Sequence, residues 1–141
     1  MTNILVNFPF EPQPKLRPRF KVRYNRVITF TPPATKAFED QVAVYYKNAV
    51  NGFCFEQGKP IAIELEFGLA IPKSTSKKDR ERMLNGFIAP AKKPDIDNLT
   101  KSVMDALNGV AWHDDAQVCH IQAGKNYTDA PYFKLKIREL G

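Results

Sequence analysis

The sequence lacks any run approaching the roughly 18 unbroken apolar residues that a membrane helix requires. Its N-terminal stretch has neither a positively charged start nor a sustained apolar run before a small-residue cleavage site, so it does not resemble a secretory signal. We therefore predict a cytoplasmic protein without a membrane partner. The only two cysteines, Cys54 and Cys119, are too far apart for a CxxC metal site and too few for a disulfide framework, so we expect free thiols.

Acidic residues are also scarce in one part of the chain. None occurs between Glu11 and Glu39, and the whole sequence has 21 Lys and Arg against 15 Asp and Glu, which gives a net charge of +6. This excess of positive charge indicates a polyanionic partner. With 141 residues and 43% hydrophobic content, the chain is long enough for one core, and we predict a single domain over residues 1–141.

The acid-free region contains a regular basic segment, residues 15–26. A cation stands at every second position, in the order Lys15, Arg17, Arg19, Lys21 and Arg23. Because a strand turns alternate side chains to one face, this pattern predicts a basic stripe suited to DNA phosphates, and Arg26 closes the segment. The alternative is an ordinary solvated strand face. Pro18 favours an edge strand or an irregular segment.

Hydrophobic periodicity predicts several strands and two main helices, and we expect them to form an α+β domain, within the broad α/β class, with a mixed sheet packed with the helices. Strands are expected at residues 4–8, 27–30, 61–70, 118–127 and 132–140. Thr31 is predicted to cap a first helix of about four turns, with Phe38, Val42, Tyr45, Tyr46 and Ala49 on its apolar side. Residues 73–93 are expected to form a mobile basic loop with one helical turn near residues 78–84.

Acid is concentrated instead in residues 92–115, which hold five aspartates. Asp97 is predicted to cap a helix over residues 98–108, which Gly109 ends. The apolar face of this helix is expected to consist of Leu99, Val103, Ala106 and Leu107. Before the helix, an extended backbone would point the carboxylates of Asp95 and Asp97 to the same side.

The chain after this helix is predicted to bring further carboxylates back to its start. A helix of this length runs about 16 Å, and the six residues after it span about 20 Å if extended. Asp114 and Asp115 would then reach Asp95 and Asp97. Carboxylates gathered in this way repel one another unless a cation lies between them, and oxygen ligands favour Mg²⁺ or Mn²⁺. These four residues are therefore predicted to be metal ligands.

Each of these residues also has an ordinary structural interpretation. Asp97 would only cap the helix, and residues 114–115 would only form a turn. Asp105 and Lys101 would form a surface pair. Alternatively, Lys101 lies one helical turn after Asp97, so its ammonium would either reach a phosphate or pair with Asp97. His113 is interpreted as a hydrogen-bonding neighbour of the carboxylates, and the alternatives are a metal ligand or a proton shuttle.

The stretch KPDIDNLTKSVMDALNGVAWHDDAQV, within residues 92–125, resembles the signature of the RusA-like Holliday junction resolvases. This resemblance implies a small α/β homodimer that makes paired, Mg²⁺-dependent cuts in four-way DNA junctions. It assigns the catalytic carboxylates to Asp95, Asp97 and Asp115, with Asp114 beside them. It assigns the essential lysine to Lys101.

We therefore expect a metal-dependent endonuclease that resolves branched DNA in recombination and repair, with one site per chain and two chains per dimer. The alternatives are a nuclease for another branched or flap nucleic acid and a non-catalytic DNA-binding module. A bacterial cell and a phage both remain open as the source. The residues expected to contact DNA are Lys15, Arg17, Arg19, Lys21, Arg23, Arg26, Lys77, Lys78, Lys92, Lys93 and Lys125.

Overall fold

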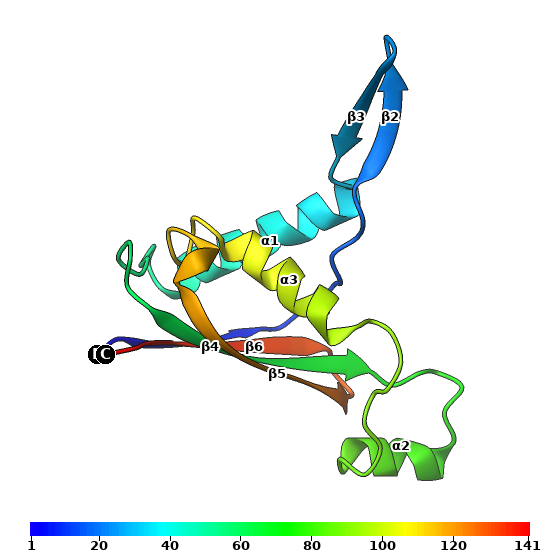
Figure 1. Ribbon diagram of the computed structural model, residues 1–141. Helices are drawn as coiled ribbons and strands as arrows, with labels where there is room; N and C mark the ends of the chain where they lie inside the picture. The colour runs from blue at the N-terminus through cyan, green and yellow to red at the C-terminus, as the bar shows by residue number, and fades with distance from the viewer.

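The centre of the protein is a mixed four-stranded β-sheet. The computed structural model describes the whole chain, Met1–Gly141. The strands are β1 (Asn3–Phe8), β4 (Ile61–Ala70), β5 (Val118–Thr128) and β6 (Tyr132–Glu139), and they lie in the order β1-β6-β4-β5 (Figure 1). Strand β4 pairs antiparallel with β6 and parallel with β5. The parallel pair requires a long crossover connection, and the candidate site lies on that connection.

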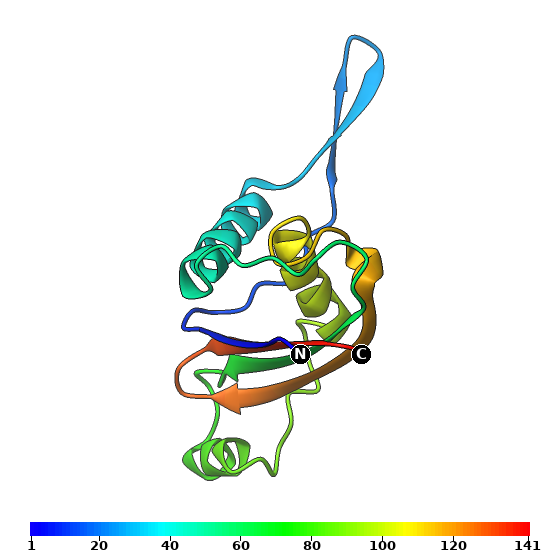
Figure 2. The same cartoon turned by 90° about the vertical axis from the view of Figure 1, so that its left-hand side faces the viewer.

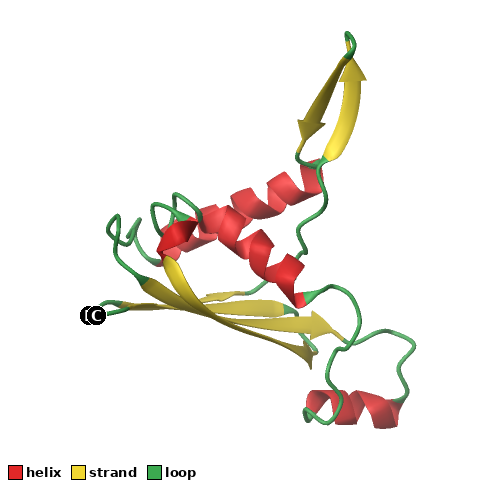
Figure 3. Ribbon diagram, viewed as in Figure 1, coloured by secondary structure: helices red, strands yellow, loops and turns green.

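Two helices, α1 (Pro33–Ala49) and α3 (Ile96–Leu107), cover one face of the sheet, whereas α2 (Lys77–Leu84) lies apart beyond the other face (Figures 1 and 2). The predicted inward side of β4 is buried, and so is the predicted apolar face of α3. The α+β class with a mixed sheet packed against two main helices is therefore confirmed, and the short α2 is a third helix (Figure 3). None of the helices is long and apolar enough to cross a membrane.

The first helix departs from the prediction at its start and on one side. Pro32 occupies the cap position and makes no side-chain capping bond, so the prediction of Thr31 as the cap is wrong. Phe38 and Tyr46 are buried in the core as predicted, but Tyr45 is 37% exposed. The tyrosine lies at the rim, because it is one position away from the row that faces the sheet.

The turn after α3 is tighter than predicted. The N–H of Gly109 donates to the carbonyl of Trp112 at 2.8 Å, and the N–H of Ala111 donates to Leu107 at 2.9 Å. Residues 109–114 are therefore not extended. Trp112 is fully buried, and burial of its large apolar ring holds this turn against the core.

Strands β2 (Arg19–Arg23) and β3 (Arg26–Phe30) form a separate hairpin that projects from the body (Figure 1). Tyr24 and Asn25 join them with φ values of 51° and 58°, as a tight two-residue hairpin turn requires. The basic segment is thus a strand over only part of its length. Pro18 immediately precedes β2, which agrees with its predicted irregular or edge position.

The far face of the sheet and α2 are polar. Glu64 and Glu66 face Lys136 and Lys134 across the strands at 3.9 and 3.8 Å, so the predicted solvated face of β4 is confirmed. Helix α2 is longer than the single turn predicted and contains no buried residue. It is connected to the turn after β5 by an ion pair of 2.6 Å between Arg80 and Asp129.

Candidate active site

The start of α3 carries two of the predicted site carboxylates. Asp95 occupies the cap position in an extended conformation, and its side chain makes no capping hydrogen bond. Asp97 lies inside the first turn, where its Oδ1 accepts a hydrogen bond from the N–H of Asn98 at 2.9 Å. The prediction of Asp97 as the cap is therefore wrong. Negative charge here is favourable, because the helix dipole gives this end partial positive charge.

An open pocket of about 550 Å³ lies beside α3. Asp97, Lys101 and Asp105 follow one another at four-residue intervals and so share one face of the helix. Asp115 joins them from the turn after α3. The remaining lining residues are Ile96, Thr100, Met104, Ile121 and Ala123. Three carboxylates and one ammonium therefore share a pocket whose other side chains are mainly apolar.

Trp112 and Gln117, for which the sequence motif predicts no role, hold Asp115 and its turn in place. The buried Trp112 donates from Nε1–H to Asp115 Oδ1 at 2.7 Å. Gln117 accepts two backbone N–H bonds from the same turn, at 2.9 and 3.1 Å. Its amide nitrogen donates to two backbone carbonyls of residues 56–59, at 2.8 and 3.0 Å. The turn is thus fixed by a buried amide, whereas the side chain of His113 makes no hydrogen bond to the carboxylates.

The environment of Asp115 disfavours its ionised form. Burial raises the pKa of this carboxyl above its ordinary value, and the neighbouring carboxylates of Asp105 and Asp114 raise it further. The hydrogen bond from Trp112 opposes this rise in pKa. A cation bound in the pocket would reverse the balance, because it favours the ionised carboxylate.

The other two predicted ligands lie outside this pocket. Asp95 lines a neighbouring pocket of about 700 Å³, together with residues 11–17 and the loop before α3. Asp114 instead accepts the N–H of Ala116 at 3.2 Å and caps the short 3-10 turn η1 (Asp115–Gln117). No group of three or more His, Cys, Asp or Glu side chains lies close enough to hold a metal ion. The predicted four-carboxylate site is therefore divided, because α3 begins at Ile96 and turns Asp97 away from Asp95.

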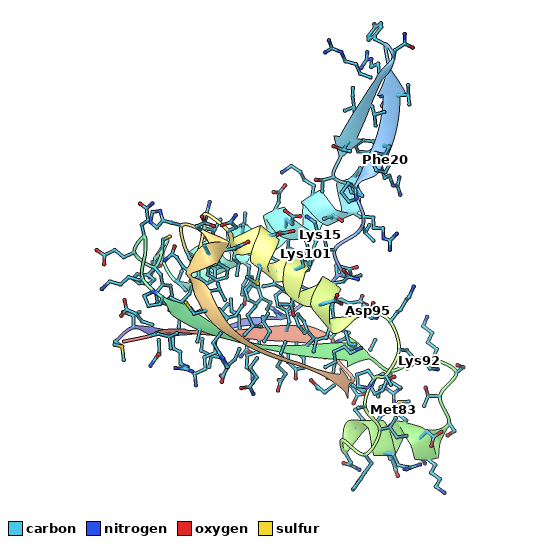
Figure 4. The ribbon with its side chains drawn as sticks, viewed as in Figure 1. Lys15, Phe20, Met83, Lys92, Asp95 and Lys101 are labelled. Carbon is cyan, nitrogen blue, oxygen red and sulfur yellow. The ribbon has the colours of Figure 1, made fainter.

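The chemistry of the donors nevertheless suits a hard divalent cation. Asp95, Asp97 and Asp115 form no ion pair with any Lys or Arg of the chain. Their oxygens are of the type that Mg²⁺ prefers in proteins. Lys101 also forms no ion pair, so the predicted alternatives of pairing with Asp97 or Asp105 are not seen. Figure 4 shows Lys101 on α3, further along the helix than Asp95 at its start.

The hairpin has one basic face and one uncharged face. Arg19 lies opposite Phe30, Lys21 opposite Ile28, and Arg23 opposite Arg26. Since cross-strand partners share a face, four cations lie on the same side. The other side consists of Phe20, Val22, Val27 and Thr29, and every residue of both strands is exposed. The predicted alternating pattern thus holds within the hairpin.

Two of the lysines predicted to contact DNA make internal contacts. Lys15 Nζ lies 2.7 Å from Glu39 Oε1 and 3.1 Å from Asp105 Oδ2. Lys125 Nζ donates to two backbone carbonyls of residues 92–94, each at 3.0 Å, and so supports the loop that leads to Asp95.

The remaining predicted DNA contacts outside the hairpin are solvent-exposed. Arg17 lines the same pocket as Asp95. Lys77 and Lys78 lie on α2, and Lys92 and Lys93 lie in the loop before α3. These side chains are free to meet a phosphate backbone, in contrast to Lys15 and Lys125.

The fold and these residues define a small basic α+β protein that has a pocket with carboxylates and an unpaired lysine on its body and a basic hairpin that projects from it. The family model described as endodeoxyribonuclease RusA matches residues 9–138, so the chain belongs to the RusA family of endodeoxyribonucleases. It is also similar to the Uncharacterized protein YqaN of Bacillus subtilis (strain 168), with 32% identity over 137 residues that cover 92% of each chain. The resemblance seen in the sequence is therefore confirmed at the level of the family.

Proposed function

We propose that the protein is a Mg²⁺-dependent endonuclease that resolves four-way DNA junctions in recombination and repair. The observation that carries the proposal is the pocket shared by Asp97, Lys101 and Asp115, in a chain of the RusA family. Mn²⁺ satisfies the same oxygen donors and is expected to substitute for Mg²⁺.

Each residue has a distinct proposed role. Asp97 and Asp115, which share the pocket, would hold the ion, which would supply an activated water and neutralise charge on the phosphate. A bound ion would favour the ionised form of Asp115, and Trp112 keeps its carboxylate oriented. The ammonium of Lys101 donates hydrogen bonds to a phosphate oxygen in the transition state. The basic face of the hairpin binds the DNA backbone away from the reacting phosphate.

The direct test uses purified protein with end-labelled four-way, flap and linear DNA, each with Mg²⁺ and with EDTA. We expect paired, symmetric cuts in the four-way junction with Mg²⁺ and none with EDTA. Equal cutting of flap or linear DNA in a competition assay would instead indicate a nuclease of another substrate class. Binding that is equal in EDTA, without cleavage of any substrate, would indicate a DNA-binding module.

Metal binding is tested separately by thermal unfolding. A ligand that binds only the folded state stabilises it by about 2.7 kcal/mol at 100 times its Kd. Mg²⁺ is therefore expected to raise the Tm of the native protein and to have a smaller effect on Asp97→Asn. An equal Mg²⁺ response in both proteins would remove Asp97 from the ligand set.

We also propose that the functional form is a homodimer. Each chain supplies one candidate active site, whereas resolution of a four-way junction requires two symmetric cuts, and two-fold dimers are the commonest oligomers. The exposed uncharged face of the hairpin, including Phe20 and Val22, supports an association of this kind. Light scattering should give about 32 kDa, twice the 16.0 kDa of one chain. A monomer that still makes paired cuts within one binding event would contradict the proposal.

A further inference from the structure

Lys15 connects three parts of the protein next to the candidate site. Its backbone N–H donates to the carbonyl of Asn98 at 3.0 Å. Its ammonium contacts Glu39 of α1 at 2.7 Å and Asp105 of α3 at 3.1 Å. The Lys15 side chain is only 19% exposed, so these contacts are largely shielded from water. Figure 4 shows Lys15 and Lys101 beside the two helices.

The contact between Lys15 and Asp105 matters because of what Asp105 would otherwise do. Lys101 and Asp105 are four residues apart on α3, a spacing at which opposite charges usually pair. They line the same pocket but form no ion pair, and Asp105 instead contacts Lys15. Asp97, one turn before Lys101, is likewise engaged, with the N–H of Asn98. Both acidic neighbours of Lys101 thus have other partners.

The charge state of Lys15 is suited to this contact. Burial alone lowers the pKa of this lysine, but the hydrogen bonds to Glu39 and Asp105 outweigh burial and leave the pKa raised. The ammonium therefore stays charged at physiological pH. It also offsets part of the negative charge of Asp105, which lines the pocket that a phosphate would approach.

We propose that Lys15 is a positioning residue that holds the Asp105 carboxylate away from Lys101, so that the Lys101 ammonium stays available to the DNA phosphate. The catalytic part of this inference rests on the proposed nuclease function. The inference replaces the direct DNA contact that the sequence pattern predicts for Lys15. The two roles differ in one respect that can be measured: only the positioning role depends on Asp105.

The central test is a second-site rescue. Lys15→Met is expected to lower the single-turnover cleavage rate at saturating junction DNA about tenfold, because Asp105 then pairs with Lys101 and repels phosphate. Lys15→Met combined with Asp105→Asn should restore the rate to within about twofold of the native protein, because no acid remains to capture Lys101. Lys15→Arg, which keeps the charge, should also cleave at nearly the native rate.

Glu39 provides the matched control. Lys15→Met combined with Glu39→Gln also removes a partner carboxylate, but it should leave the rate as low as in Lys15→Met alone. In Lys15→Met combined with Asp105→Asn, Glu39 still lacks its Lys15 partner. Recovery of the cleavage rate without recovery of the Tm would therefore distinguish positioning of Asp105 from an effect on stability. Lys36→Met removes an exposed cation of α1 that pairs with Asp40, and it should leave the rate unchanged.

Two outcomes would overturn the inference. One is a double variant with Asp105→Asn that cleaves as slowly as Lys15→Met, since Lys15 would then act on DNA directly or only through stability. The other is a loss of cleavage in Asp105→Asn alone, which would make Asp105 part of the catalytic machinery.

A chemical readout keeps the inference separate from the nuclease proposal. Acetylation of Lys101 by N-hydroxysuccinimide acetate, followed by mass spectrometry, reports whether its amine is paired. The rate of Lys101 acetylation should fall about twofold in Lys15→Met and return to the native value when Asp105→Asn is added. If the native protein cuts no DNA, the proposed function fails, while this acetylation pattern still decides the role of Lys15. An unchanged acetylation rate in Lys15→Met would refute that role.

Discussion

The hairpin β2–β3, which we propose binds DNA, and the helix α3, which we propose contributes to catalysis, differ in how far they are packed against the core. Leu99, Val103 and Leu107 of α3 are fully buried, whereas every residue of the hairpin strands is exposed. A two-stranded hairpin alone is marginally stable in water, while a helix packed on a core is rigid. Bond-breaking chemistry demands fixed geometry, and phosphate binding tolerates movement. We therefore expect substitutions in the two regions to have separable effects.

Asp115→Asn should show the largest difference between an effect on cleavage and an effect on DNA binding. We expect cleavage to fall about a thousandfold, because one candidate metal ligand and its charge are lost. Junction binding should survive, since removal of a negative charge does not weaken attraction to phosphate. Single-turnover cleavage measures the rate, and filter binding of the same preparation measures the affinity for the junction. Asp40→Asn, an exposed acid of α1, serves as the control, and a parallel loss of binding in Asp115→Asn would contradict the division of roles.

The stability of the two regions should differ next. Leu99→Ala leaves a cavity under α3 and is expected to lower the free energy of unfolding by about 2–5 kcal/mol. Val22→Ala on the exposed hairpin should change the free energy of unfolding by less than about 0.5 kcal/mol. Urea unfolding at dilute protein concentration measures both. A large loss in Val22→Ala would show that the uncharged hairpin face is buried in an assembly.

The hairpin cations should affect binding rather than chemistry. Replacing Arg19, Lys21 and Arg23 by Gln removes three cations from one face. The slope of log K against log salt should fall in magnitude by about 2.7, at about 0.9 per phosphate contact, and affinity should fall about ten- to a hundredfold. The cleavage rate at saturating DNA should be unchanged. An unchanged slope of log K against log salt would indicate that DNA binds at the loop of residues 73–93 instead of at the hairpin.

Local sequence patterns predicted most of the fold. The alternation in β4 and the helical spacing of Leu99, Val103 and Leu107 each report burial on a single element, and the structure confirms both. Cap positions were less predictable. Thr31 and Asp97 are common cap residues, yet Pro32 and Asp95 occupy the cap positions. Local propensity is a weak guide to a helix start, because tertiary context overrides it.

The arrangement of the site was predictable only in part. Asp97 and Asp115 share a pocket whereas Asp95 lies in a neighbouring one, and the buried ring of Trp112 lies in the turn that leads to Asp115. The partner of Lys15 was not predictable, because Glu39 and Asp105 approach it only after α1 and α3 pack together. Alternation along a single strand reports which side a residue faces, and it contains no information about such distant partners.

The smallest expected effect is a pH dependence that originates at Asp115. Its pKa is raised in the folded protein, mainly by burial, so the folded state binds this proton more tightly than the unfolded state does. The contribution of Asp115 therefore favours folding below its ordinary pKa and is lost as pH rises through the raised pKa. Without metal, the free energy of unfolding of the native protein relative to Asp115→Asn should decrease between pH 3.5 and 7 in urea titrations. Trp112→Phe removes the hydrogen bond that lowers this pKa, so the decrease should become steeper in that background, and a flatter profile would contradict the assignment.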